Sequence, residues 1–524
     1  MGSRPVAPEG ARYRFGPLER RGLVAGWRGG QIGSVAGGLV VAVLALRSHP
    51  TPGTVAVAVV TVLGGIAFAC WPIGGRTGEE WLPTVARWEG GRLSGSRWYR
   101  TVAPGAGHRL GAGGKSPHRR PVVSGHGHRR RPGPVGPFGD LDLLVAGGPS
   151  RPACGVVVDR RARTYTAVLS LRGHNFALLD ATEKERQVGR WAGVLASLAR
   201  AGSSVHRVQW LATTVPDDGH GVRHHLAERA VLDDKETARR SYTSLLDGAG
   251  ARTCRHETLL AVQISATAKG GSAARAAGRG HAGGCAAVLR EADALRRALG
   301  EADVVVDGLL APAQLAEVLR RSGEAGPISR APTAADGPGE SGSAGDVVHR
   351  LASSGSPWPM ATEAEWGCMR IDALWHATYW ISEWPRVDVG PDFLAPLLLG
   401  SSRRTVSVVM EPLAPELAVR QVEQARTADL ADSELRRRGG FLATARRARE
   451  EELVTRREEE LADGHASLRF SGYVTVTASS RELLEGACEE TEQAAGQCRL
   501  ELRRLYGDQD RGFATSLPLC RGLS

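Results

Sequence analysis

The sequence predicts an N-terminal two-helix transmembrane hairpin followed by α+β cytoplasmic domains. Three observations lead to this fold class. Two uncharged apolar runs lie near the start of the 524-residue chain, at 32–46 and 54–71. From residue 140 onward, strand-like and helix-like patterns succeed one another, which favours sheets covered by helices. Hydrophobic residues make up 42% of the chain, enough for a buried core, so a wholly disordered protein is excluded.

The two apolar runs, IGSVAGGLVVAVLAL (32–46) and TVAVAVVTVLGGIAFACW (54–71), are expected to form a membrane hairpin over 23–72. A spanning helix needs about 20 residues, which the first run reaches when it is extended back through 23–31. Both runs are apolar on every side, unlike the half-exposed helix of a soluble protein. Since a second run follows the first at once, without a clear cleavage site, a signal peptide is disfavoured.

Arginines flank both open ends of the predicted hairpin, whereas the turn RSHPTPG (47–53) carries only Arg47. The positive-inside rule therefore predicts a multi-pass protein whose N-terminus and main body are cytoplasmic. Small residues on the two runs would let the helices, or a partner helix, approach closely. These residues are Gly33, Gly37, Gly38, Gly64 and Gly65.

Residues 73–138 are predicted to be a juxtamembrane segment and a disordered basic linker. The part 101–138 carries seven cations and no acid, with almost no large apolar residue. Such a tract beside the inner leaflet attracts anionic lipid; an inert spacer and a nucleic-acid contact are the alternatives. The first 138 residues hold 19 Lys and Arg against 5 Asp and Glu, and the remainder holds 48 against 51. We therefore interpret the net charge of +11 as a topology signal.

Two α+β domains are expected in the body, at 139–320 and 356–524, with a Gly/Ser/Pro-rich linker at 321–355 between them and a basic tail at 1–22 before the hairpin. Strand patterns are found at 156–171 (a hairpin), 205–213, 258–265, 304–306, 369–389, 405–413 and 467–478. Helix patterns are found at 182–200, 226–246, 285–299, 312–320, 415–435, 440–463 and 481–506.

Two glycine-rich strings are partly similar to nucleotide-binding loops. A phosphate loop needs G-x-x-x-x-G-K-[ST] between a strand and a helix, but GGKS (113–116) has Arg109 where the first glycine belongs. GRGHAG (278–283) matches G-x-G-x-x-G literally, yet about a dozen loose residues separate it from the strand that ends at Ser265. We interpret it as a flexible glycine loop, and a nucleotide-binding enzyme is the alternative.

No catalytic or metal site is predicted. The chain has no G-x-S-x-G or H-E-x-x-H motif, and His376 is expected to lie in the core or at an edge. Eight cysteines without a C-x-x-C pair predict buried, reduced thiols. One histidine group beside two acids matches no metal-ligand spacing: Asp217, Asp218, His220, His224 and His225. The sequence therefore predicts a non-enzymatic protein with no cofactor.

Five tryptophans crowd into a short stretch of the final third. They could stack on nucleic-acid bases, but no cations are interleaved with them, so a packed core is preferred. They are Trp358, Trp366, Trp375, Trp380 and Trp384.

Six segments carry a resemblance to a known family: YRFGPLERRGLVAGWRGGQ (13–31), FACWPIGGRTGEEWLPTVARW (68–88), WHATYWISEWPRVDVGPDFLAPLLL (375–399), SVVMEPLAPELAVRQVE (407–423), FSGYVTVTA (470–478) and RLYGDQDRGFATSLPLCRGL (504–523). They resemble a family of actinobacterial membrane proteins found in conjugation and type IV-like secretion clusters, alongside PrgI-like partners and a conjugative ATPase. The final third also resembles the N-terminal, non-ATPase domain of TraC-like conjugative ATPases, in which such segments lead into the motor.

The resemblance implies a structural component of the bacterial inner (plasma) membrane that anchors or organises a separate motor ATPase. Its expected partners are the lipid bilayer, that ATPase and other membrane subunits, within an oligomeric complex. In layout, the two-helix anchor with a cytoplasmic body is also similar to EccE of type VII secretion, which is one alternative. A membrane-tethered nucleotide- or DNA-binding protein is the other.

Overall fold

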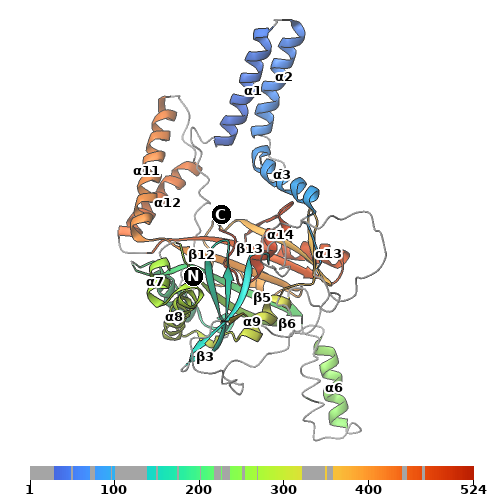
Figure 1. The fold of residues 1–524 in the computed structure, drawn as a ribbon, viewed down its shortest axis with the longest axis vertical. Coiled ribbons are helices and arrows are strands. Elements are labelled where there is room, and N and C mark those ends of the chain that lie inside the picture. The colour runs from blue at the N-terminus through green and yellow to red at the C-terminus, as the bar shows by residue number, and fades with distance from the viewer. Residues whose placement is uncertain are drawn as a thin grey trace, which may run out of the picture.

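The computed structural model describes residues 29–48, 51–70, 77–95, 97–100, 138–148, 151–173, 176–200, 202–216, 226, 237–250, 254–267, 270–321, 349–350, 358–438, 445–462 and 466–523. Two apolar helices, α1 (Gly29–Ser48) and α2 (Pro52–Cys70), form a hairpin that stands clear of the body (Figure 1). Each contains an 18-residue window that is long and apolar enough to cross a membrane. The two predicted apolar helices are therefore present.

Close packing of α1 on α2 depends on two of the five predicted glycines. A Cβ atom at Gly38 would lie 3.2 Å from the backbone oxygen of Thr61, and one at Gly65 would lie 3.1 Å from that of Ser34. The other three glycines, Gly33, Gly37 and Gly64, face open space. Gly38 and Gly65 thus allow the two helices of the hairpin to pack closely, whereas the other three glycines stay exposed.

Helix α3 (Gly78–Ser94) follows the hairpin and leads to β1 (Trp98–Arg100) at the edge of the sheet. Glu79 and Glu80 lie in its first turn, where negative charge is favoured by the helix dipole. Gly95 ends it in the left-handed conformation, with φ +69°. The juxtamembrane segment therefore holds a helix, whereas the basic linker at 101–137 lies outside the described residues.

The first half of the body has the split β-α-β topology of ferredoxin-like folds. Four strands lie in the order β7-β4-β6-β5, and every neighbouring pair is antiparallel. They are β4 (Thr164–Arg172), β5 (Val205–Pro216), β6 (Cys254–Ser265) and β7 (Val305–Leu309). Helix α4 (Ala181–Leu198) connects β4 to β5, and α8 (Gly280–Glu301) lies between β6 and β7.

The second half repeats this topology. Its strands lie in the order β14-β11-β13-β12 and are again antiparallel throughout. They are β11 (Leu374–Glu383), β12 (Arg404–Pro412), β13 (Leu468–Ala478) and β14 (Glu501–Arg504). Helices α10 (Ala395–Leu398) and α13 (Arg481–Gln497) take the places of α4 and α8. The body is therefore built from two copies of one arrangement.

Matching accessory elements strengthen the comparison of the two halves. A strand that pairs as a hairpin with the first strand precedes it, one or two helices are inserted between the second and third strands, and a helix follows the fourth strand. In the first half these are β3 (Arg151–Asp159), α6 (Thr237–Gly250) and α9 (Pro312–Arg321). In the second half they are β10 (Met369–Ile371), α11 (Pro415–Arg438) with α12 (Ala445–Ala462), and α14 (Gln509–Phe513).

The two halves meet edge to edge. Strands β5 and β12 pair in antiparallel register from Thr214 opposite Arg404 to Val208 opposite Met410. The result is one 14-stranded sheet that β2 (Leu141–Gly148), β8 (His349–Arg350), β9 (Ala361–Ala364) and β1 extend at its ends. Strands from both expected domains share this sheet, and separate folding of the two segments stays a prediction.

Alternation along β5 gives the sheet two buried faces. Val208 packs with residues of α4 and α8, whereas Leu211 packs with α9, α14 and the C-terminal segment 517–520. On the second half, Leu484 of α13 covers the helix-bearing face. Because side chains alternate along a strand, the paired strands β5 and β12 direct equivalent positions to the same face. Helices α4, α8 and α13 thus share one face, and residues 517–520 lie on the other.

Two predictions need correction. The helix pattern at 481–506 is wrong beyond Gln497, because Arg499 adopts a left-handed φ of +58° and 501–504 form β14 against β11. The stretch between Ser265 and GRGHAG is not loose, since its alanines form α7 (Gly270–Ala277). Single-turn 3₁₀ helices, η3 (Phe176–Leu178) and η4 (Ala514–Ser516), were not predicted.

Candidate functional site

The most distinctive contact of the body is with α3, at a place that we call the junction: Trp81, Thr84, Arg87 and Trp88 of α3, with Trp366, Gly507 and Asp508 of the body. Trp366 lies against two α3 rings. It stacks on Trp81 with ring centroids 5.8 Å apart, and it meets Trp88 edge-on at 5.3 Å. Positions 81, 84 and 88 share one helix face. The junction therefore attaches the helix that follows the apolar hairpin directly to the second half of the body.

Polar contacts complete the junction at Asp508. Thr84, which is 2% exposed, donates its hydroxyl to Asp508 Oδ2 at 3.1 Å. Arg87 Nη2 lies 3.2 Å from Asp508 Oδ1. Gly507 makes the approach possible, because it has φ +76° and a Cβ there would lie 2.8 Å from side-chain atoms of both Thr84 and Trp366. A side chain at this position would push α3 away from the body.

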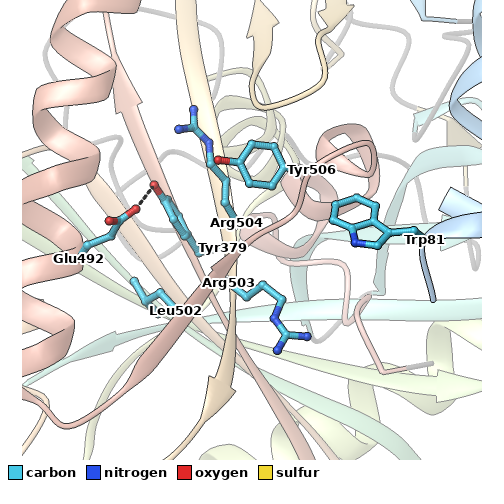
Figure 2. A pocket seen from close by; sticks show the side chains of 7 residues that line it. All are labelled: Trp81, Tyr379, Glu492, Leu502, Arg503, Arg504 and Tyr506. Carbon is cyan, nitrogen blue, oxygen red and sulfur yellow. Dashed lines mark hydrogen bonds between the residues drawn. The ribbon is translucent and has the colours of Figure 1, made fainter. Parts of the chain in front are cut away.

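A pocket of about 370 Å³ opens beside the junction, and Figure 2 shows its lining side chains. They come from α3, β11, α13 and the β14 region: Trp81, Tyr379, Glu492, Leu502, Arg503, Arg504 and Tyr506. The Tyr379 hydroxyl donates to Glu492 Oε1 at 2.9 Å. Burial raises the pKa of Tyr379, and the neighbouring Cys488 raises it further. Tyr379 therefore acts as a neutral hydrogen-bond donor that ties β11 to α13.

Arg504 carries the strongest polar contacts of this pocket. Its Nη1 and Nη2 atoms each lie 2.8 Å from one carboxylate oxygen of Glu485, and its Nε donates to the Gly367 oxygen at 2.7 Å. Burial by itself lowers the pKa of Arg504, but the Glu485 hydrogen bonds, together with the charge interactions with Tyr379, Cys488 and Glu485, raise the pKa above its usual range. The same bonds lower the pKa of Glu485. This bidentate pair holds α13 on β14 beside the junction.

The pairing of β5 with β12, which we call the seam, is covered by the C-terminal segment. Buried glutamines hold this segment in place. Gln209 Nε2 donates to Ser407 Oγ at 2.8 Å and to the Thr515 oxygen at 2.7 Å, and Gln209 Oε1 accepts the Cys520 N–H at 2.7 Å. Gln263 Nε2 donates to the Leu519 oxygen at 3.0 Å. Because Gln209 is fully buried, each of these bonds satisfies a group that water does not reach.

A second pocket of about 430 Å³ lies between β4, β6 and α9. Its charged residues are paired within the protein: Arg172 with Asp307 at 2.7 Å, and Arg321 with Glu257 at 3.4 Å. Arg403 Nη2 also donates to the Arg321 oxygen at 3.0 Å. This last bond joins the residue before β12 to the end of α9, so it contributes to holding the two halves together.

His376 and the tryptophans lie in different environments. His376 is 1% exposed, its Nδ1 lies 2.9 Å from Thr477 Oγ1, and its ring centroid is 4.7 Å from that of Phe513. Trp358 is buried in the same core cluster as Phe513. Trp366 departs from the expected packed core, since it is 37% exposed and contacts α3. A signal for this contact was present in the sequence, where Trp81 and Trp88 fall seven residues apart after the hairpin.

The first two residues of GRGHAG lie between α7 and α8 and the other four belong to α8, so the string is not the flexible glycine loop that the sequence predicts, and no strand comes directly before it. Gly278 and Gly280 have positive φ values, and α8 begins at Gly280. A Cβ at Gly283 would lie 2.3 Å from the backbone oxygen of Gly278, and one at Gly284 would lie 2.3 Å from the ring of Tyr165. These glycines let α7, α8 and β4 pack closely, which accounts for the string without a nucleotide.

Two motifs that the sequence analysis rejected as sites fall outside the part of the chain that the structure describes: GGKS (113–116), and the group of Asp217, Asp218, His220, His224 and His225. Within the described ranges, no three or more His, Cys, Asp or Glu residues are grouped so as to hold a metal ion. Burial raises the pKa of the Cys285 thiol to about 12 and that of Cys368 to about 11.

Comparisons with known proteins bring no further assignment: no protein-family model matches this chain, and no curated protein matches it.

Proposed function

We propose that this protein is a non-enzymatic structural component of the bacterial inner membrane, in a type IV-like conjugation or secretion machine. Its cytoplasmic body anchors or organises a separate motor ATPase. The observation that carries the proposal is the junction, because it couples a large folded body to a two-helix apolar hairpin through packed rings and an ion pair. A protein that only tethered its body would not need such a contact.

The surface of the hairpin suits lipid. Leu44 is 61% exposed, Val60 69% and Leu63 59%, and these side chains come from both helices. Contiguous apolar surface of this kind marks a membrane or protein contact. The arginines that flank its open ends support a cytoplasmic position for the body.

A surface for the motor is offered by α6, on the side of the body away from α1 and α2 (Figure 1). This amphipathic helix leaves Tyr242 45% and Leu245 67% exposed. A docking helix for a cytoplasmic motor would present such a face away from the membrane.

The resemblance noted in the sequence covers segments with clear structural roles. FSGYVTVTA (470–478) lies in β13, in the middle of the second half, and 504–523 include Gly507, Asp508 and the C-terminal segment. In TraC-like proteins, such segments belong to the domain that precedes the motor. Their presence supports a body of that kind, acting next to a motor.

Site-specific photo-crosslinking in native membranes tests this proposal. A photoreactive amino acid replaces Leu245 in the full chain, and the adduct is identified by mass spectrometry. We expect an adduct with a P-loop ATPase. The matched control replaces Leu93 of α3, which is 87% exposed, and should give no such adduct. If neither Leu245 nor other exposed positions of α6 give an adduct that contains an ATPase, the docking role is refuted. If the ATPase in the adduct is the motor of a type VII system, the EccE-like alternative is favoured.

A further inference from the structure

The inserted helical hairpin of α11 and α12 extends from the body on the same side as α1 and α2 (Figure 1). Helix α11 has 24 residues, which corresponds to a length of about 36 Å. At the base, Ala418, Val422 and Ala425 are buried, and farther along Arg426 pairs with Glu458 of α12. The hairpin thus has a packed base and a far end that lies well away from the core.

The far end of this hairpin is strongly basic. We call it the basic tip and define it by the arginines at the last positions of α11 and the first positions of α12: Arg436, Arg437, Arg438, Arg446, Arg447 and Arg449. Between Glu434 and Glu450 the sequence contains six arginines and no acid. The antiparallel return of the chain brings the two arginine groups to one end of the hairpin.

The end of α11 is a favourable place for its arginines, because a helix C-terminus attracts cations, but the start of α12 is an unfavourable one. The N-terminus of a helix carries partial positive charge and favours acids. Helix α12 has no acid in its first turn and instead begins ARRAR, while its acids follow from Glu450 onward. Repulsion among like charges at one end adds to that cost. An external anionic surface would offset both effects.

The side of the body on which the basic tip lies decides which anion it meets. The hairpin extends toward the membrane helices, and the cytoplasmic leaflet is rich in anionic lipid. Clusters of four to eight Lys or Arg residues next to a membrane helix are typical of such lipid contacts. We propose that the basic tip binds anionic lipid headgroups of the membrane that α1 and α2 cross. The proposal rests on the membrane anchoring proposed above, and it adds a second contact that fixes the body's tilt.

Fluorescence quenching in nanodiscs tests this contact with the full chain. A fluorescent amino acid replaces Ala448 of α12, and the quencher is a nitroxide attached to lipid headgroups. The nanodiscs contain either phosphatidylcholine alone or 30 mol% phosphatidylglycerol. We expect quenching to rise severalfold with the anionic lipid and to fall again in 0.5 M NaCl, because salt screens these charges.

Charge reversal provides the decisive comparison. Arg437→Glu with Arg446→Glu should reduce the bound-to-free ratio of the tip at least tenfold, since each arginine near the surface contributes about fivefold. The control, Arg290→Glu with Arg420→Glu, makes the same charge change at exposed positions away from the tip and should retain the quenching. Equal quenching in nanodiscs with and without phosphatidylglycerol would overturn the proposal. Binding of the tip to added DNA in place of the lipid, seen as a loss of quenching, would overturn it as well. Failure of nanodisc insertion would instead count against the anchor.

Discussion

Trp81 of α3 lies flat against Trp366 of the body, with ring planes only 20° apart and centroids 5.8 Å apart. These two residues are 285 positions apart in the sequence, and their contact joins α3 to the body. Trp88 meets the same Trp366 ring edge-on, so this ring contacts two positions of one helix. Offset aromatic pairs of this kind each stabilise by about 0.5–1.5 kcal/mol beyond area burial.

Gly507→Ala should open the junction. The new Cβ would lie 2.8 Å from Thr84 and Trp366 atoms, at a φ of +76° that costs about 1–3 kcal/mol for alanine. We expect faster amide hydrogen exchange across α3, with unchanged exchange in α8. Gly486→Ala is the control, because a Cβ at that α13 position meets open space. Unchanged α3 exchange in Gly507→Ala would show that the junction does not hold α3.

Gln209→Ala should weaken the seam between the two halves. It leaves the Cys520 N–H and the Thr515 oxygen buried without their partner, at about 1–3 kcal/mol for each group. The midpoint of thermal unfolding of the detergent-solubilised chain should fall. Gln421→Ala changes an exposed glutamine of α11 and should leave the midpoint unaltered. Equal midpoints for both variants would contradict this role of the C-terminal segment.

Glu490→Gln should destabilise the second half through Arg404. The Arg404 side chain is 0% exposed, and its Nη2 lies 2.9 Å from Glu490 Oε1. Because Glu490 is itself 42% exposed, we expect the loss of a charged hydrogen bond, about 1.5–3 kcal/mol, and not the full cost of an isolated buried ion. Glu489→Gln, one exposed position away, should change stability by less than about 0.5 kcal/mol. Thermal unfolding of the two variants measures the difference.

Stability should decline below about pH 6.5 in part because of His206. Burial lowers the pKa of His206 in the folded chain, Arg207 and Arg469 lower it further, and Glu411 opposes them. The unfolded chain, with an ordinary histidine pKa of about 6.5, therefore binds the proton first. This contribution is complete above pH 6.5 and is lost as the pH falls toward the folded pKa. Between pH 7.5 and 5.5, the midpoint of thermal unfolding should fall less for His206→Gln than for the wild type. An equal fall in both proteins would exclude this effect.

Local pattern predicted most individual elements of the body. The hairpin of β3 and β4, the strands β5, β6, β12 and β13, and the helices α4, α8 and α9 all lie where residue periodicity placed them. The apolar helices followed from composition alone, because few soluble segments lack charge over such a length. Strand β14 was missed because Leu500 and Leu502 continue an apolar spacing that also suits a helix.

The pairing of strands that are far apart in the sequence could not be predicted. Leu211 and Ser407 lie opposite each other at the seam, but nothing in either strand specifies the other as its partner. The repeat of one topology in both halves could not be predicted, because the two halves show no obvious similarity in sequence. Trp358 and Trp366 look alike in the sequence, yet one is core and the other contacts α3. Such distinctions depend on tertiary packing, which a single sequence does not display.

The most direct test of the central claim is recovery of the motor with the full chain. The tagged protein is crosslinked in native membranes, extracted in detergent and purified, and its partners are identified by mass spectrometry. A membrane-anchored platform predicts a P-loop ATPase of a conjugation or secretion system among the crosslinked partners, enriched over membranes that lack the tagged chain. Membranes that contain such an ATPase but yield none of it with the purified chain would contradict the account.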